Sequence, residues 1–223
     1  MFIWEIICVK IGKDKYKGAA KMKKIKWLAT GGTISSVETE KGLVPASSDE
    51  QMKKMLEVLG LASENICTEQ LMNIDSTEIS CDDIRNIGIA ADKAVRGGFD
   101  GIIITHGTDT MEESAWFLDL TLDSPKPVVL VGAQRNASEA DFDGPRNLFN
   151  AVRICLSNEA REKGVVICLN DQINAAREAS KTSTSEVATF KSGDFGFLGQ
   201  VDPDAVRFYR SPARRQFLPL GED

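Results

Sequence analysis

The sequence has 223 residues, a formal net charge of −6 and a single histidine. This length suits one ordinary domain, and 42% hydrophobic with 27% charged residues is typical of a folded globular chain rather than a disordered one. The acidic balance argues against nucleic acid as a partner, no apolar run approaches the ~20 residues of a membrane-spanning helix, and one histidine excludes metal sites built from several.

The first 21 residues differ from the rest of the chain. They begin with an apolar stretch that contains Glu5 and continue into a lysine-rich segment, without the basic start and small-residue cleavage site of a secretory signal. The segment that begins at Met22 resembles a natural protein start. We therefore expect residues 1–21 to be a non-native or disordered N-terminal extension.

From Lys24 onward, apolar runs of strand length alternate with helical patterns five times. Each run is short and largely apolar, as expected of a parallel strand that is covered on both faces. Helix starts between the runs carry capping signals, such as Ser80 with Asp83 and Thr110 with Glu113. The strands are expected, in chain order, at residues 25–30, 66–74, 101–105, 128–131 and 165–169.

This alternation predicts an α/β domain with a mostly parallel sheet and helices on both faces. The pattern changes after the fifth strand. Residues 171–191 are polar and read as a loop, and residues 201–209 suit a terminal hairpin.

The functional residues are expected in the loops that follow the strands, because ligands of open α/β sheets bind beyond the carboxyl ends of the strands. The first such loop carries Gly31 and Gly32 in a spacing that matches neither a dinucleotide-binding motif nor a P-loop. Thr33 follows them. It is either the cap of a Gly-Gly turn or a nucleophile beside backbone N–H groups that stabilise an oxyanion.

A hydroxyl nucleophile needs a group that takes its proton. In the third loop, Thr108 and Asp109 either cap the next helix or face the crevice. His106 is one candidate base, with a hydrogen-bonded structural role as its alternative. Lys181 is another, and a solvated surface lysine is the alternative for it. The residues alone thus predict a crevice lined by hydroxyl groups, suited to hydrolysis of a small polar substrate.

Two long motifs then identify a family. Residues 28–34 (LATGGTI) and 104–113 (ITHGTDTMEE) resemble the two signature sequences of the bacterial-type L-asparaginases. The resemblance implies that residues 22–215 form that family's N-terminal catalytic domain, a Rossmann- or flavodoxin-like fold, and that residues 216–223 are a divergent tail. Shorter similarities continue through residues 132–135, 143–145, 170–171, 181–182, 188–192 and 210–214.

The resemblance also implies a reaction. The family hydrolyses L-asparagine, and sometimes L-glutamine, to the acid and ammonia, and it needs no metal or other cofactor. By resemblance, Thr33 is the nucleophile, and Thr108, Asp109 and Lys181 form a second catalytic group. The substrate-binding residues implied in the same way are Gly32, Asp75, Ser76, Thr77, Thr108 and Asp109.

The sequence departs from the family pattern in three places. Residues 35–48 contain no tyrosine to support the nucleophile, and Thr77 stands where periplasmic members often have glutamine, which leaves the choice between asparagine and glutamine open. The resemblance also implies a smaller C-terminal α/β domain, which normally completes the site of a neighbouring subunit in a dimer or tetramer, and we expect that domain to be missing here. We therefore expect either an asparaginase that is a homo-oligomer in its full-length form, or a truncated, inactive remnant that at most binds small amino acids.

The five cysteines predict a reducing compartment. None belongs to a CxxC pair, and their odd number is scattered through apolar segments. Such usage is typical of reduced thiols in the cytosol. Together with the missing secretory signal, it predicts a cytoplasmic protein without membrane partners.

Overall fold

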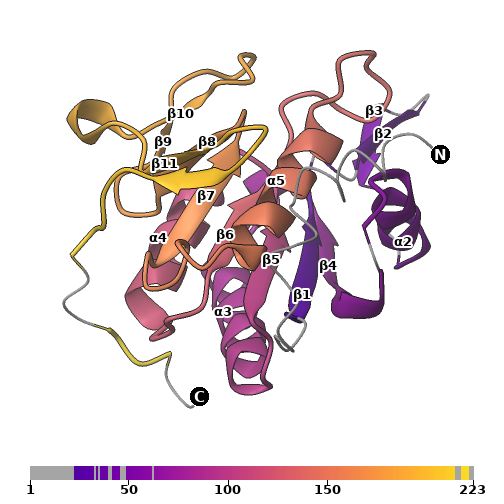
Figure 1. Cartoon of the computed structure of the whole chain (residues 1–223). Coiled ribbons are helices and arrows are strands. Elements are labelled where there is room, and N and C mark those ends of the chain that lie inside the picture. Colours follow the sequence, from indigo (N-terminus) through magenta and orange to yellow (C-terminus); the bar gives the residue numbers. More distant parts are fainter. Residues whose placement is uncertain are drawn as a thin grey trace.

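The computed structural model describes residues 23–220, apart from 33, 35, 40–41, 46–48, 62 and 214–216. The expected N-terminal extension therefore lies outside the described residues, and its state stays a prediction. Five parallel strands form the centre of the molecule (Figure 1). They are β1 (Ile25–Gly31), β4 (Ile66–Ile74), β5 (Gly101–Thr105), β6 (Val128–Val131) and β7 (Val165–Leu169).

The parallel strands lie in the spatial order β4-β1-β5-β6-β7. Counted along the chain this is the order 2-1-3-4-5 of flavodoxin-like folds, in which the ligand site lies where the order reverses, at the first and third strands. The five predicted strands are confirmed, four of them with the expected bounds and the first one residue longer. The reversal between β1 and β5 therefore marks where a site is expected.

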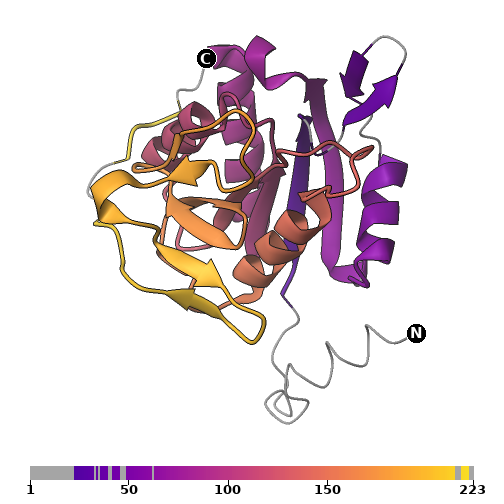
Figure 2. The same ribbon diagram turned by 90° about the horizontal axis from the view of Figure 1, so that it is seen from above.

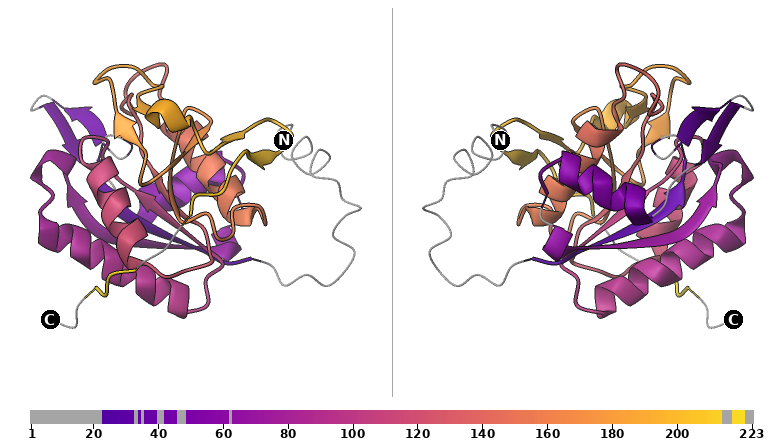
Figure 3. Two further views of the ribbon diagram at one scale, coloured as in Figure 1. Left: turned by 90° about the vertical axis from the view of Figure 1, so that its left-hand side faces the viewer. Right: turned by 90° about the vertical axis from the view of Figure 1, so that its right-hand side faces the viewer.

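Helices cover both faces of the sheet, as predicted (Figures 2 and 3). Trp27 and Ala29 pack into the core on one face, whereas Leu28 between them packs into the core on the other, because successive side chains of a strand alternate. The first core is shared with α2 (Asp49–Val58) and α5 (Gly144–Leu156), and the second with α3 (Cys81–Arg96) and α4 (Met111–Thr121).

The sheet continues beyond β7 with three antiparallel strands, β8 (Gln172–Ala175), β11 (Gly199–Val201) and β12 (Val206–Phe208). Strands β11 and β12 form the predicted terminal hairpin. Two separate ribbons lie in the upper part of Figure 1, β2 (Ser36–Thr39) with β3 (Gly42–Pro45) on the right and β9 (Ser180–Lys181) with β10 (Phe190–Lys191) on the left.

Two local predictions were wrong. Residues 171–191 are not one continuous loop, because they contain β8, β9 and β10. Asn170 and Asp171, with φ of 50° and 63°, form a tight turn that sends β8 back along β7. Thr110 does not cap α4 with its side chain. Its hydroxyl instead donates to the backbone carbonyl of Ser76, 2.7 Å away. The capping box of Ser80 and Asp83 at the start of α3 is confirmed.

Candidate active site

Three loops interlock at the point where the strand order reverses. Gly32, after β1, has a φ of +81°, and a Cβ atom on it would overlap the backbone of Gly107, after β5. A Cβ on Gly107 would in turn lie 2.6 Å from the Cβ of Ser76, after β4. The absence of side chains at these glycines therefore lets the residues predicted to bind substrate come together.

Ser76 ties the β4 loop to the start of α4. It lies in η3 (Ser76–Glu78), is 3% exposed, and its hydroxyl oxygen accepts the backbone N–H of Asp109 at 3.3 Å. Because that oxygen accepts here, the hydroxyl proton is directed elsewhere. Asp75 and Thr77 flank it at the surface, where the Asp75 carboxylate accepts both the backbone N–H and the hydroxyl of Thr77, at 2.9 and 2.7 Å.

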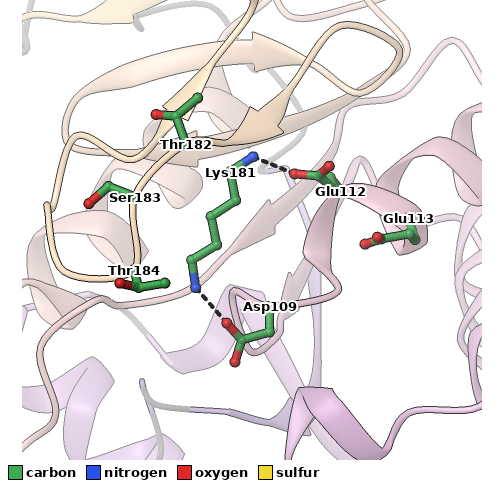
Figure 4. Close-up of a pocket in the computed structure, with 7 residues that line it drawn as sticks. All are labelled: Asp109, Glu112, Glu113, Lys181, Thr182, Ser183 and Thr184. Carbon is green, nitrogen blue, oxygen red and sulfur yellow. Dashed lines mark hydrogen bonds and ion pairs between the residues drawn. The ribbon is translucent and has the colours of Figure 1, made fainter.

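Lys181 contacts the other two residues of the second predicted catalytic group, Thr108 and Asp109. Its Nζ donates to Asp109 Oδ1 at 2.7 Å (Figure 4). It also donates to Thr108 Oγ1 at 2.7 Å. The lysine side chain is 13% exposed and that of Asp109 is 51% exposed, so the ion pair is half open to solvent. Thr108 is buried. The structure thus brings together three residues that the sequence spreads over more than 70 positions.

The β9–β10 ribbon carries Lys181 to this place. Phe190 in β10 is buried in the core on the α3 and α4 side of the sheet, and this burial anchors the ribbon. Glu112, in the first turn of α4, holds it from the side, since its carboxylate accepts the hydroxyl of Ser180 at 3.0 Å and the backbone N–H of Lys181. No role was predicted for Glu112 from the sequence. Its place within the second signature motif was the local signal.

Gln134 is a second residue that the sequence analysis left without a role. It follows β6, at the same edge of the sheet, and is half-buried. Thr108 donates its hydroxyl proton to Gln134 Oε1 at 2.9 Å. The position after a strand end could have singled it out, but its contact with Thr108 depends on the fold.

His106 has a structural environment. It is fully buried, its Nδ1 lies 2.7 Å from the carbonyl oxygen of Gly107, and its Nε2 lies 3.0 Å from the hydroxyl of Ser114. Burial lowers its pKa, because the cationic imidazolium loses its hydration. Both ring nitrogens are engaged away from the crevice, which fits the structural alternative.

An open pocket of about 500 Å³ lies beside the lysine. Acidic, basic and hydroxyl side chains line it, a combination that suits a small molecule carrying both an ammonium and a carboxylate. Thr33 lies outside the described residues, so the prediction for it stays a prediction. The pocket is lined by Asp109, Glu112, Glu113, Lys181, Thr182, Ser183 and Thr184 (Figure 4).

Fold and site together define an α/β domain of flavodoxin-like strand order with a lysine–threonine–aspartate group at the reversal point. A family model described as the N-terminal domain of asparaginase matches residues 24–214. The chain belongs to the asparaginase family, as the two signature motifs predicted.

Individual proteins agree with this assignment. The chain is 42% identical over 208 residues to a probable periplasmic L-asparaginase of Haemophilus influenzae, covering 90% of this chain and 58% of that protein. It is 37% identical to L-asparaginase 2 of Escherichia coli, with the same two coverages. A crystal structure of a probable cytoplasmic L-asparaginase from Campylobacter jejuni matches with a TM-score of 0.79 and 38% identity, over 86% of this chain and 60% of that one. The chain thus spans little more than half the length of these relatives.

No helix in the described part of the chain is both long and apolar enough to cross a membrane.

Proposed function

We propose that this chain is the catalytic N-terminal part of an L-asparaginase, an amidohydrolase that converts L-asparagine and water to L-aspartate and ammonia. The observation that carries the proposal is the Lys181 ammonium, held 2.7 Å from both Thr108 Oγ1 and Asp109 Oδ1 where the strand order reverses. Relatives that bear the name L-asparaginase support it.

The substrate's two charged ends have complementary groups in the site. Asp109 is half-exposed, and its carboxylate attracts the α-ammonium group, while the Ser76 hydroxyl donates to the α-carboxylate. Asp75 and Thr77 extend the same loop, and Gly32 keeps the wall beside the reacting amide clear of side-chain atoms.

We assign the nucleophile to Thr33. Its hydroxyl oxygen attacks the side-chain amide carbon of asparagine, its proton passes to the amide nitrogen, and ammonia leaves. The product of this step is an ester between the threonine and the aspartyl group. Water then attacks the ester carbon, one of its protons returns to the threonine oxygen, and L-aspartate is released.

Thr108 and Lys181 handle protons in this scheme. The lysine ammonium donates to Thr108 Oγ1, which stabilises negative charge as it develops on that oxygen and lets the pair pass a proton toward the reacting amide. Neither step uses a metal or an organic cofactor.

Three further assignments belong to this proposal. We place L-glutamine as a second substrate, because Thr77 stands where periplasmic members often have glutamine, which leaves the choice between the two amides open. The ratio of the two turnover numbers tests this. We propose a homo-oligomer for the full-length form, tested by light scattering, and a cytoplasmic location, tested by cell fractionation.

Ammonia release from L-asparagine tests the function. The wild-type chain is expected to release ammonia, and Thr33→Ala is expected to abolish the release while L-aspartate still binds in a calorimeter. Thr68→Val, a threonine in β4 at the opposite end of the strand, is the matched control and should keep wild-type turnover. Binding of L-aspartate by the wild-type chain without any turnover would instead identify a domain that only binds small amino acids.

A further inference from the structure

Gln134 stands in a bend that the side chain of Asp143 fixes. Its N–H group donates to the Asp143 carboxylate at 3.1 Å, the N–H of Arg135 donates to the same carboxylate at 2.9 Å, and Asn147 donates to it from α5. One carboxylate, itself bonded to α5, therefore holds the backbone at Gln134 and Arg135, and the Gln134 side chain reaches the candidate site from this fixed base.

The side chain of Gln134 makes contacts in two directions. Its Oε1 accepts the hydroxyl proton of Thr108 at 2.9 Å, and its Nε2 donates to the carbonyl oxygens of Ser183 and Glu186, at 3.4 and 3.2 Å. The opposite orientation of the amide would place an oxygen against two carbonyl oxygens. The loop therefore determines which end of the amide faces Thr108.

This arrangement fixes the direction of the Thr108 proton. A threonine hydroxyl has one proton, and the Lys181 ammonium has no lone pair with which to accept it. With Lys181 donating to Oγ1, the proton must point to another acceptor, and Gln134 Oε1 is placed to receive it. One lone pair of the threonine oxygen then faces the lysine.

The same amide also docks the loop that carries the lysine. Residues 182–189 connect β9 to β10, and the two carbonyl groups bonded to Gln134 belong to this loop. Hydrogen bonds thus run from Lys181 to Thr108, on to Gln134, and back to the loop that starts at Lys181. A closed ring of this kind restrains the separation of the lysine and the threonine.

We propose that Gln134 is a positioning residue for the reaction. It orients the Thr108 hydroxyl and holds the 182–189 loop so that Lys181 stays in contact with Thr108. The role of Gln134 in catalysis rests on the proposed function. Its effect on the Thr108 hydroxyl and on the 182–189 loop is measured without substrate.

Two substitutions separate the two contacts in the full chain. Gln134→Met has a similar volume but neither donates nor accepts, so both contacts are lost. Gln134→Glu keeps an acceptor for Thr108 but cannot donate to the loop carbonyls. Gln200→Met, at a half-buried glutamine in β11, is the matched control.

Hydrogen exchange of residues 182–189 and the side-chain ammonium signal of Lys181 are the two measurements. The ammonium gives a resolved proton–nitrogen signal only while hydrogen bonds slow its exchange, and Lys181→Arg identifies it by its loss. We expect loop exchange to become roughly tenfold faster in both Gln134 variants, since each loses the bonds to the loop. The ammonium signal of Lys181 should vanish in Gln134→Met and persist in Gln134→Glu. In the control Gln200→Met, both the loop exchange and the ammonium signal should match wild type.

Two results would overturn the proposal. One is loop exchange within twofold of wild type in Gln134→Met. The other is faster loop exchange with an unchanged Lys181 signal in that variant, which would leave Gln134 a purely structural role. Failure of the wild-type chain to release ammonia would overturn the proposed function, and it would leave these two measurements intact.

Discussion

Gly32 lies where the loop after β1 packs directly against the loop after β5. We predict that this position tolerates no side chain. Its φ of +81° costs a residue with a Cβ about 1–2 kcal/mol. That Cβ would also overlap the Gly107 backbone and lie 2.9 Å from the carbonyl carbon of His106, and relieving such overlap by backbone shifts costs about 1–3 kcal/mol. Gly32→Ala should therefore lower the free energy of unfolding by about 2–5 kcal/mol.

Gly98→Ala is the matched control for this prediction. Its φ is +89°, but no atom lies within 4 Å of the Cβ position, so it carries the backbone cost alone. Urea unfolding of the two variants and the wild type measures the difference. An excess of about 2 kcal/mol for Gly32→Ala corresponds to a further drop in Tm of roughly 4–8 °C for a chain of this size. Equal destabilisation by the two substitutions would refute the close packing of the loops.

Further predictions concern buried ionisable groups. Arg177→Met should destabilise by about 1–3 kcal/mol in urea, because the buried Asp119 carboxylate loses the guanidinium 2.5 Å away and keeps only its remaining contacts, such as the N–H of Val165. Adding Asp119→Asn should restore part of this, and no rescue would contradict the pairing. Burial lowers the pKa of His106 in the folded state, so as the pH falls the unfolded state takes up a proton on this histidine before the folded state does. The free energy of unfolding should therefore decrease below pH 6.5, by at most about 1.4 kcal/mol per pH unit. His106→Gln should remove that slope from a comparison of Tm at several pH values, and an identical slope in the variant would contradict it. Burial raises the pKa of Cys155 and Cys168, so both should resist iodoacetamide until the chain unfolds; peptide mass mapping that finds either modified in the folded chain would refute this.

The parallel core could be read from the sequence because its signals are local. Runs such as residues 101–105 are continuous and apolar, which is what burial on both faces requires, and their bounds are confirmed. Strand β8 was missed because Gln172 and Asn174 make it half polar, and it forms only by pairing with β7. Short strands stabilised by a neighbour carry little signal of their own.

The candidate site divides in the same way. The second signature motif led to Thr108 and Asp109, the shorter similarity at residues 181–182 led to Lys181, and the structure brings these three together. Gln134 was missed because its partners come from two distant parts of the chain. The cap at Thr110 was predicted wrongly for the same reason, since its hydroxyl bonds a carbonyl group 34 positions away.

The most direct test of the account is ammonia release from L-asparagine by the full chain with Lys181→Met. Lys191→Met is its matched control, an exposed lysine on the partner strand of the same ribbon. Removing a group that moves protons in the reaction should lower kcat by roughly 10²–10⁴-fold, while the control stays at the wild-type value. Retention of more than a tenth of wild-type kcat by Lys181→Met would contradict the assignment of Lys181 to the catalytic group.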